Sequence, residues 1–106
     1  MRRMTVGELK ASLNGSEQRP FLLDVREPWE YGICRIDGAH LIPMRSIPDS
    51  LQELDPGRET VVICHHGIRS RQVALYLEHQ GFSRVINMEG GVAAWAREVD
   101  PAMPTY

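Results

Sequence analysis

One of the two cysteines in this 106-residue chain stands where an apolar run meets a loop. The stretch reads VVICHHGIRS, so Cys64 follows a β-branched segment and precedes two histidines, a glycine and Arg69. A thiolate in an electropositive loop is a nucleophile, and an arginine can engage an oxyanion through two parallel hydrogen bonds. The pattern predicts a thiolate that attacks an anionic substrate and carries a covalent intermediate.

The loop after Cys64 has the composition of an anion cradle. A short loop that enters a helix points successive backbone N–H groups at one anion, and a glycine permits the backbone conformations that this requires. The two histidines could add donors or positive potential, and the sequence assigns neither as a proton carrier. We expect Cys64 to be catalytic and the substrate to be bound by His65, His66, Gly67, Ile68, Arg69 and Ser70.

Less specific interpretations compete with this one. A lone cysteine at the end of a strand is usually a small buried apolar residue, and loop histidines are often merely solvated. A metal site made of Cys64, His65 and His66 is disfavoured, because adjacent residues rarely satisfy tetrahedral geometry together and no CxxC or HxxxH partner exists. We therefore expect no metal.

Composition narrows the class of protein. Hydrophobic residues make up 42% of the chain and charged residues 25%, which is ordinary for one globular domain. A net charge of -2 argues against a general nucleic-acid binder, and no apolar stretch approaches a membrane span. The start, MRRMTVGELK, does not resemble a secretion signal, and two cysteines cannot form a disulfide scaffold. We expect a cytoplasmic protein with reduced thiols.

The elements that must position the loop alternate between strands and helices. Thr5 and Glu8 form a capping-box pattern before the first expected helix. Buried-type strands separated by helices predict an α/β domain with a mainly parallel sheet, in which ligands gather at the carboxyl ends of strands. Strands are expected at 21–25, within 38–43, at 60–64 and at 84–88, and helices at 5–13, 27–33, 46–54, 70–81 and 90–98.

Four stretches, taken together and in this order, resemble the single-domain rhodaneses, a sulfurtransferase family. They read LLDVREPWEY (22–31), IDGAHLIPM (36–44), VVICHHGIRS (61–70) and NMEGGVAAWA (87–96). The resemblance implies one rhodanese domain over residues 1–106. Its fold would be a rhodanese-like α/β fold, with a central, mainly parallel five-stranded sheet flanked by helices on both faces.

The resemblance also implies roles for individual residues. Cys64 would become a persulfide held by loop amides, and Arg69 would help to hold an oxyanion such as the sulfonate end of thiosulfate. Asp24 and Arg26 would support the loop. For Asp24, loop support and a simple turn cap are equally favoured. Arg26 is expected to form a structural ion pair with Glu27 or Glu30.

The activity implied is transfer of a sulfane sulfur from thiosulfate or a related small anionic donor to an acceptor. The acceptor would be a thiol, cyanide or a small sulfur-carrier protein. No cofactor is needed, because the sulfur is carried on the protein itself. Neither nucleic acid nor a membrane is expected as a partner.

One segment departs from the family pattern. Where members often read Gly-His-Ile-Pro-Gly-Ala, this chain has CRIDGA (34–39). Cys34 therefore replaces a glycine. It is either an incidental thiol, which we favour because nothing around it is built to activate it, or a second redox-active thiol that resolves the Cys64 persulfide.

Two other functions stay open. Cysteine phosphatases and arsenate reductases also place a cysteine–arginine loop before a helix, but with five residues between the two. Here four residues separate Cys64 from Arg69, which makes a smaller cradle that suits one sulfur atom. A non-catalytic partner-binding module is the other alternative, and the presence of both Cys64 and Arg69 argues against it.

Overall fold

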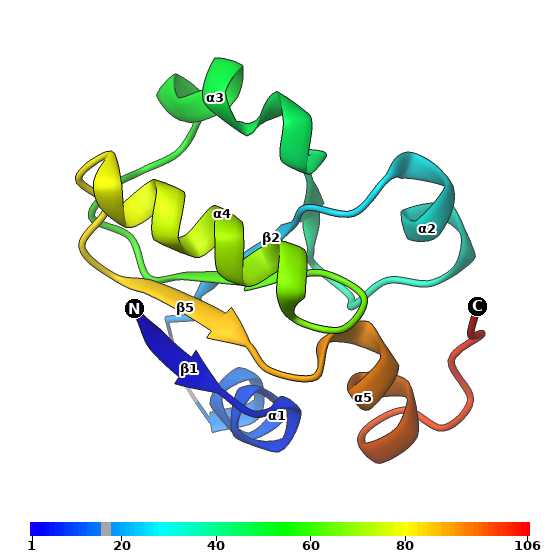
Figure 1. Cartoon of the computed structure of the whole chain (residues 1–106). Helices are drawn as coiled ribbons and strands as arrows, with labels where there is room; N and C mark the ends of the chain where they lie inside the picture. Colours follow the sequence, from blue (N-terminus) through cyan, green and yellow to red (C-terminus); the bar gives the residue numbers. More distant parts are fainter. Residues whose placement is uncertain (16–17) are drawn as a thin grey trace.

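All paired strands of the sheet run parallel, as the sequence predicts. The computed structural model describes residues 1–15 and 18–106, and within them the strand order is β1-β5-β4-β2-β3 (Figure 1). The strand β4 is central, so the residues that follow it emerge at the middle of the carboxyl edge. The bounds are β1 Arg2–Met4, β2 Phe21–Asp24, β3 His40–Leu41, β4 Thr60–Ile63 and β5 Val85–Met88.

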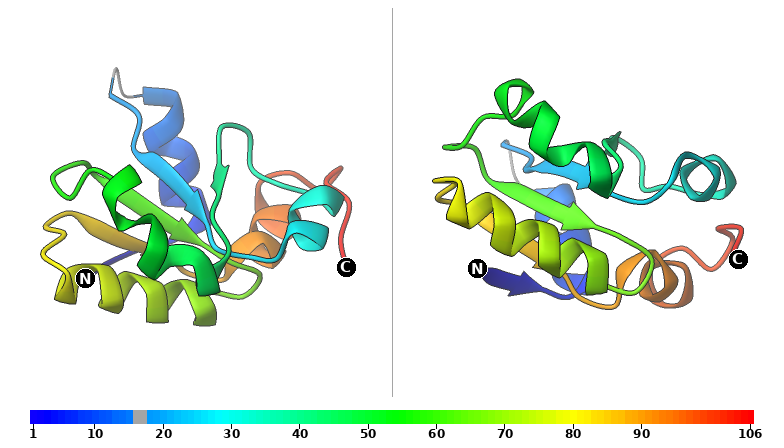
Figure 2. Two further views of the ribbon diagram at one scale, coloured as in Figure 1. Left: turned by 90° about the horizontal axis from the view of Figure 1, so that it is seen from above. Right: turned by 45° about the horizontal axis from the view of Figure 1, so that its top comes forward.

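Helices cover both faces of this sheet, which confirms the predicted α/β architecture of a central sheet between two layers of helices (Figure 2). α1 and α5 pack on one face, and α3 and α4 pack on the other, while α2 lies beyond the carboxyl ends of the strands. The bounds are α1 Val6–Gly15, α2 Pro28–Ile33, α3 Ile47–Ser50, α4 Ile68–His79 and α5 Gly91–Glu98.

The alternation of side chains along β4 decides which face Cys64 joins. Val61 and Ile63 pack with α1 and α5, whereas Val62 and Cys64 pack with α4 on the opposite face. Successive strand residues point to opposite faces, so the register of β4 fixes the direction of the Cys64 side chain. The thiol therefore faces the helix that begins four residues later.

The first expected helix forms with the capping box that the sequence predicts. The Glu8 amide donates to the Thr5 hydroxyl at 3.1 Å, and the Thr5 amide donates to the Glu8 carboxylate at 2.9 Å. This network lowers the pKa of Glu8, because the ionised carboxylate is the better acceptor. Both terminal N–H groups are thereby satisfied by side chains.

Three local details differ from the sequence prediction. β1 was not expected, and the segment predicted as one helix over 46–54 is divided between α3 and two flanking 3₁₀ turns, Met44–Ser46 and Leu51–Glu53. α4 begins at Ile68, two residues before the predicted start. Ile68, Arg69 and Ser70 consequently form its first turn and are not part of a free loop.

The segment after α5 returns toward the carboxyl edge of the sheet and ends near α2 (Figures 1 and 2). Met103 and Tyr106 pack against the core between the sheet and the α1/α5 layer. Within the described ranges, no helix has the length and apolarity needed to cross a membrane.

Candidate active site

The Cys64 sulfur is held at the amino end of α4. Gly67, the residue before the helix, adopts φ +94° and donates its amide to the Cys64 Sγ at 3.1 Å. The Cys64 thiol donates to the Ser70 Oγ at 3.3 Å, and the Cys64 residue is only 1% exposed. The amino end of a twelve-residue helix carries partial positive charge, which favours an anionic sulfur at this position.

A buried hydrogen-bond chain supports this arrangement from β5. The Ser70 hydroxyl donates to the Asn87 Oδ1 at 2.5 Å, and the Asn87 amide donates to the Gly67 carbonyl at 3.2 Å. Ser70 is fully buried, and its hydroxyl lies between the Cys64 sulfur and Asn87. Asn87 joins both ends of the Gly67–Ser70 turn to the sheet.

The opposite side of the loop is fixed by the start of α5. The Val92 amide donates to the Cys64 carbonyl at 2.9 Å, and the Ala93 amide donates to the His65 carbonyl at 3.0 Å. A Cβ atom at Gly91 would lie 2.2 Å from the His65 oxygen. Only glycine allows this approach.

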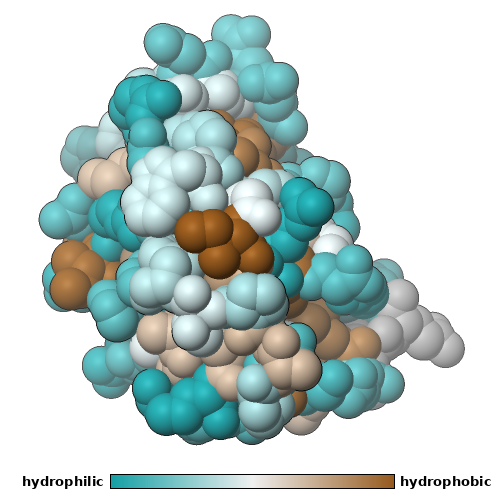
Figure 3. All heavy atoms as spheres, turned by 90° about the vertical axis from the view of Figure 1, so that its right-hand side faces the viewer, coloured by the Kyte–Doolittle hydropathy of each residue, from teal (hydrophilic) through white to brown (hydrophobic). Residues whose placement is uncertain are grey.

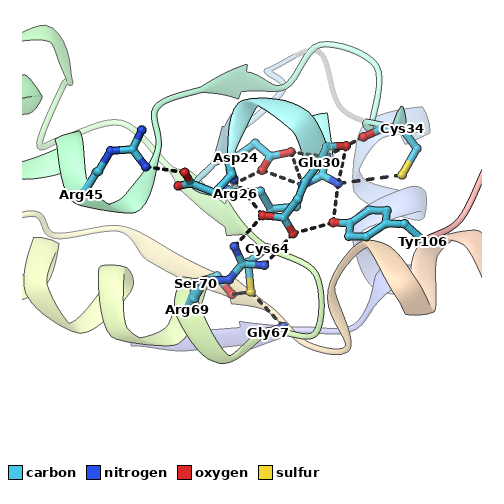
Figure 4. Close-up of polar contacts among 11 residues, drawn as sticks. Asp24, Arg26, Glu30, Cys34, Arg45, Cys64, Gly67, Arg69, Ser70 and Tyr106 are labelled. Atoms are coloured by element: carbon cyan, nitrogen blue, oxygen red, sulfur yellow. Dashed lines mark hydrogen bonds and ion pairs between the residues drawn. The ribbon is translucent and has the colours of Figure 1, made fainter. Parts of the chain in front are cut away.

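An ion pair crosses the mouth of the site (Figure 4). Both terminal nitrogens of Arg69 donate to Glu30 of α2, Nη1 to Oε1 at 2.7 Å and Nη2 to Oε2 at 2.8 Å. The Arg69 hydrogen bonds lower the pKa of the buried Glu30 to about 2, and the same bonds raise the pKa of Arg69. Arg69 therefore lies beside Cys64 as a fixed cation whose side chain is still 35% exposed.

Comparison with known proteins identifies the fold family. The family model for the rhodanese-like domain matches residues 5–98. The chain belongs to the rhodanese-like domain family.

Two members of this family align with most of this chain. The thiosulfate sulfurtransferase GlpE of Pseudomonas fluorescens is 37% identical over 86 residues, which cover 81% of this chain and 78% of the relative. The crystal structure of a rhodanese-like domain protein from Staphylococcus aureus superposes with a TM-score of 0.85 at 37% identity, covering 93% and 95% of the two chains.

Longer proteins contain similar domains. Rhodanese-like/PpiC domain-containing protein 12 of Arabidopsis thaliana, described as chloroplastic, is 44% identical over 89 residues, covering 80% of this chain. The chain spans only 30% of that relative's length. Its similarity to such multidomain proteins therefore concerns the rhodanese-like domain alone.

Within this rhodanese-like domain, the sequence prediction for Arg26 was wrong about the partner. Arg26 pairs with Asp24 at 2.7 Å, not with Glu27 or Glu30, and both side chains are fully buried. Asp24 also accepts the Arg26 amide at 3.1 Å, so its bonds form a turn cap. Arg26 also donates a hydrogen bond to the Cys34 carbonyl at 2.6 Å, and this bond connects the end of β2 to the end of α2.

Of the remaining loop residues, His65 is partly buried, and His66 and Ile68 are exposed. His65 stacks on His66 with ring centroids 4.1 Å apart, and burial together with the neighbouring His66 lowers the pKa of His65. A lowered pKa favours the neutral form of His65 near pH 7, which disfavours this ring as the source of the positive potential considered from the sequence. Ile68 is 68% exposed. Figure 3 shows the side of the molecule that lies on the right in Figure 1, where apolar side chains lie among polar ones.

The second cysteine does not face the first. Cys34 ends α2 and packs with the α1/α5 face of the sheet, whereas Cys64 packs with the α4 face. The Arg26 Nη1 lies 3.9 Å from the Cys34 sulfur, and both cysteines are free thiols. In Figure 4, Glu30 and Tyr106 stand between the two sulfurs, which favours the interpretation of Cys34 as an incidental thiol.

Three residues of the site were not predicted from the sequence. Asn87 carries a signal, because it is a polar residue within a buried strand. Glu30 was considered only as a partner for Arg26, and Tyr106 gave no signal. Across residues 1–15 and 18–106, no three His, Cys, Asp or Glu side chains are grouped so that they could hold a metal ion.

Proposed function

We propose that this domain is a sulfurtransferase that carries a sulfane sulfur as a persulfide on Cys64. The supporting observation is the position of the Cys64 Sγ, which accepts the Gly67 amide at 3.1 Å where α4 begins. A backbone donor and a helix amino end together stabilise a charged sulfur, both as the attacking thiolate and as the persulfide product.

In the first half-reaction, the Cys64 thiolate attacks the outer sulfur of thiosulfate. A new sulfur–sulfur bond forms to Cys64, the sulfur–sulfur bond of thiosulfate breaks, and sulfite leaves with that electron pair. Arg69 uses two of its N–H groups to bind Glu30, and among the described residues no partner is found for the others, so they can meet the departing oxyanion. The similarity to a thiosulfate sulfurtransferase supports thiosulfate as the donor.

In the second half-reaction, an acceptor nucleophile attacks the terminal sulfur of the persulfide. The bond between that sulfur and Cys64 breaks, and the electron pair returns to Cys64 as a thiolate. Cyanide would leave as thiocyanate, and a thiolate would leave as a new persulfide. A thiol or the tail of a small sulfur-carrier protein fits this step equally well. The cytoplasmic location expected from the sequence stays a prediction.

Steady-state kinetics with thiosulfate and cyanide test the proposal. Because each half-reaction is complete before the next begins, double-reciprocal plots at several cyanide concentrations should be parallel. Cys64→Ser should abolish turnover, and Cys34→Ala is the matched cysteine control. A generic aryl phosphate is assayed beside thiosulfate, because hydrolysis of the phosphate with no sulfur transfer would favour the phosphatase alternative.

A folded wild-type protein with neither activity would favour the partner-binding alternative. In that case Cys64→Ser should bind any cellular partner as well as the wild type does. Intersecting kinetic lines would contradict the persulfide intermediate even if sulfur is transferred.

A further inference from the structure

The segment after α5 brings one aromatic side chain into contact with the candidate active site. The ring of Tyr106 stacks on His65 with centroids 4.3 Å apart, and it meets Trp29 of α2 edge-on at 5.4 Å. The tail therefore contacts both the Cys64 loop and α2, and the Arg69–Glu30 pair joins α2 to the first turn of α4, directly after that loop.

The Tyr106 hydroxyl has a defined hydrogen-bond direction. It donates to the Glu30 Oε2 at 2.8 Å and accepts from the Arg26 Nη1 at 3.0 Å (Figure 4). Arginine has no acceptor and an ionised carboxylate has no donor, so the proton must point at Glu30. Burial raises the pKa of Tyr106 to about 12, which keeps the hydroxyl protonated at neutral pH.

Each carboxylate oxygen of Glu30 accepts one hydrogen bond from Arg69 and one from a second donor. The Glu27 amide donates to Oε1 at 2.9 Å, and Tyr106 donates to Oε2. The terminal torsion of a glutamate is soft, so a carboxylate with a single fixed donor can rotate. Two donors hold its plane, and that plane sets the direction of the two-pronged Arg69 bond.

We propose that Tyr106 is a positioning residue that acts through Glu30 to aim the Arg69 guanidinium at anions approaching Cys64. The proposal rests on the proposed role of Cys64 and Arg69 as the anion site. Tyr106 acts without contact to the sulfur donor or to the Cys64 sulfur. It fixes the Glu30 carboxylate, and this carboxylate aligns Arg69. Loss of its hydroxyl should weaken the attraction of anions to Cys64 and leave the fold intact.

The test compares two alkylating reagents on the full chain, the anion iodoacetate and the neutral iodoacetamide. The ratio of their rates at Cys64, located by peptide mass, reports how well anions are attracted to the sulfur and requires no sulfur transfer. Tyr106→Phe keeps both ring contacts and removes the hydroxyl. The iodoacetate preference should fall about threefold, the effect of one hydrogen bond. Tyr76→Phe, on the α4 face of the sheet, is the matched control and should leave the ratio unchanged.

A double-mutant cycle separates positioning from a general structural role. In an Arg69→Gln background, Tyr106→Phe should have no further effect on the ratio, because no cation remains to be aimed. With thiosulfate, Tyr106→Phe should raise KM about threefold and change kcat by less than about twofold, whereas a partly unfolded protein would lose kcat alone. Tyr106→Leu serves as a second variant and should lower the ratio at least as much.

An unchanged or increased iodoacetate preference in Tyr106→Phe would overturn the proposal. A decrease that persists in the Arg69→Gln background would also overturn it, since Tyr106 would then act by a route that does not include Arg69. Absence of sulfur transfer in the wild type would contradict the proposed function alone, because the alkylation ratio is measured without it.

Discussion

Glu30 and Arg69 form a two-pronged ion pair across 39 residues of sequence, at 2.7 and 2.8 Å. The pair joins α2 to the first turn of α4, directly beside Cys64. The carboxylate is buried while the guanidinium is partly exposed. The pair therefore fixes a cation beside Cys64 and leaves part of the guanidinium exposed, as the proposed binding of an anion requires.

The Glu30 carboxylate should make stability depend on acid pH. Its pKa falls from 4.5 to about 2 on folding, so the stabilisation is complete above pH 4.5 and is lost as the pH falls toward 2. Glu30→Gln should lower the free energy of unfolding by about 3 kcal/mol at pH 7 and by much less near pH 2. Urea unfolding at both pH values measures this, with the exposed Glu98→Gln as control. A cost that is the same at both pH values would contradict the account.

The close contact between the Cys64 loop and the first residue of α5, Gly91, predicts that adding one methyl group there has a large effect on stability. Gly91→Ala would place its Cβ 2.2 Å from the His65 oxygen at a backbone φ of +62°. The loop or α5 must then move, which should lower the free energy of unfolding by more than about 2 kcal/mol and reduce Cys64 reactivity. Gly32→Ala is the control, because nothing lies within 4 Å of its Cβ, and it should be neutral or slightly stabilising. If the two variants had the same stability and the same Cys64 reactivity, the close contact between Gly91 and His65 would not be what holds the loop.

The hydrogen bonds of Asn87 predict that β5 supports the sulfur site. Asn87→Ala leaves the Ser70 hydroxyl and the Gly67 carbonyl without their buried partner. The free energy of unfolding should fall by about 1–3 kcal/mol, and alkylation of Cys64 by iodoacetamide should become slower. Asn14→Ala, at an exposed position of α1, should change neither quantity. If Asn87→Ala lowers stability but leaves the alkylation rate of Cys64 unchanged, the role of Asn87 is structural only.

The separation of the two thiols predicts that Cys34 is dispensable for catalysis. Cys34→Ala should keep sulfur uptake and the same turnover with cyanide, because Cys34 packs on the other face of the sheet from Cys64. Mass analysis during turnover measures the persulfide that accumulates. If the variant loaded sulfur normally but failed to release it to a thiol acceptor, Cys34 would be the resolving thiol after all.

The elements whose local signals are strong were predictable from sequence. The apolar run of β4, the glycine in the turn after Cys64 and the capping box of Thr5 and Glu8 are each encoded within a few residues, although α4 begins two residues before its predicted start. β1 lacked such a signal, because its residues are Arg2, Arg3 and Met4, and they form an edge strand with charged side chains. Edge strands need only one partner and tolerate polar residues on both faces.

The connections of the site were not predictable, because they join residues far apart in the chain. Glu30 contacts Arg69 and Tyr106 across 39 and 76 positions, and no local pattern specifies such pairs. The prediction that Arg26 pairs with Glu27 or Glu30 failed for the opposite reason. Asp24, two residues before Arg26, accepts both its backbone amide and its guanidinium within the same bend, and a buried pair two residues apart gives no periodic signal.

The account depends most on whether Cys64 carries sulfur. Intact-mass analysis of the full chain after incubation with thiosulfate measures this directly. We predict a gain of one sulfur atom, assigned to Cys64 by peptide mass, reversed by cyanide, absent in Cys64→Ser and present in Cys34→Ala. A folded wild-type protein that gains no sulfur from thiosulfate or from a small persulfide would contradict it.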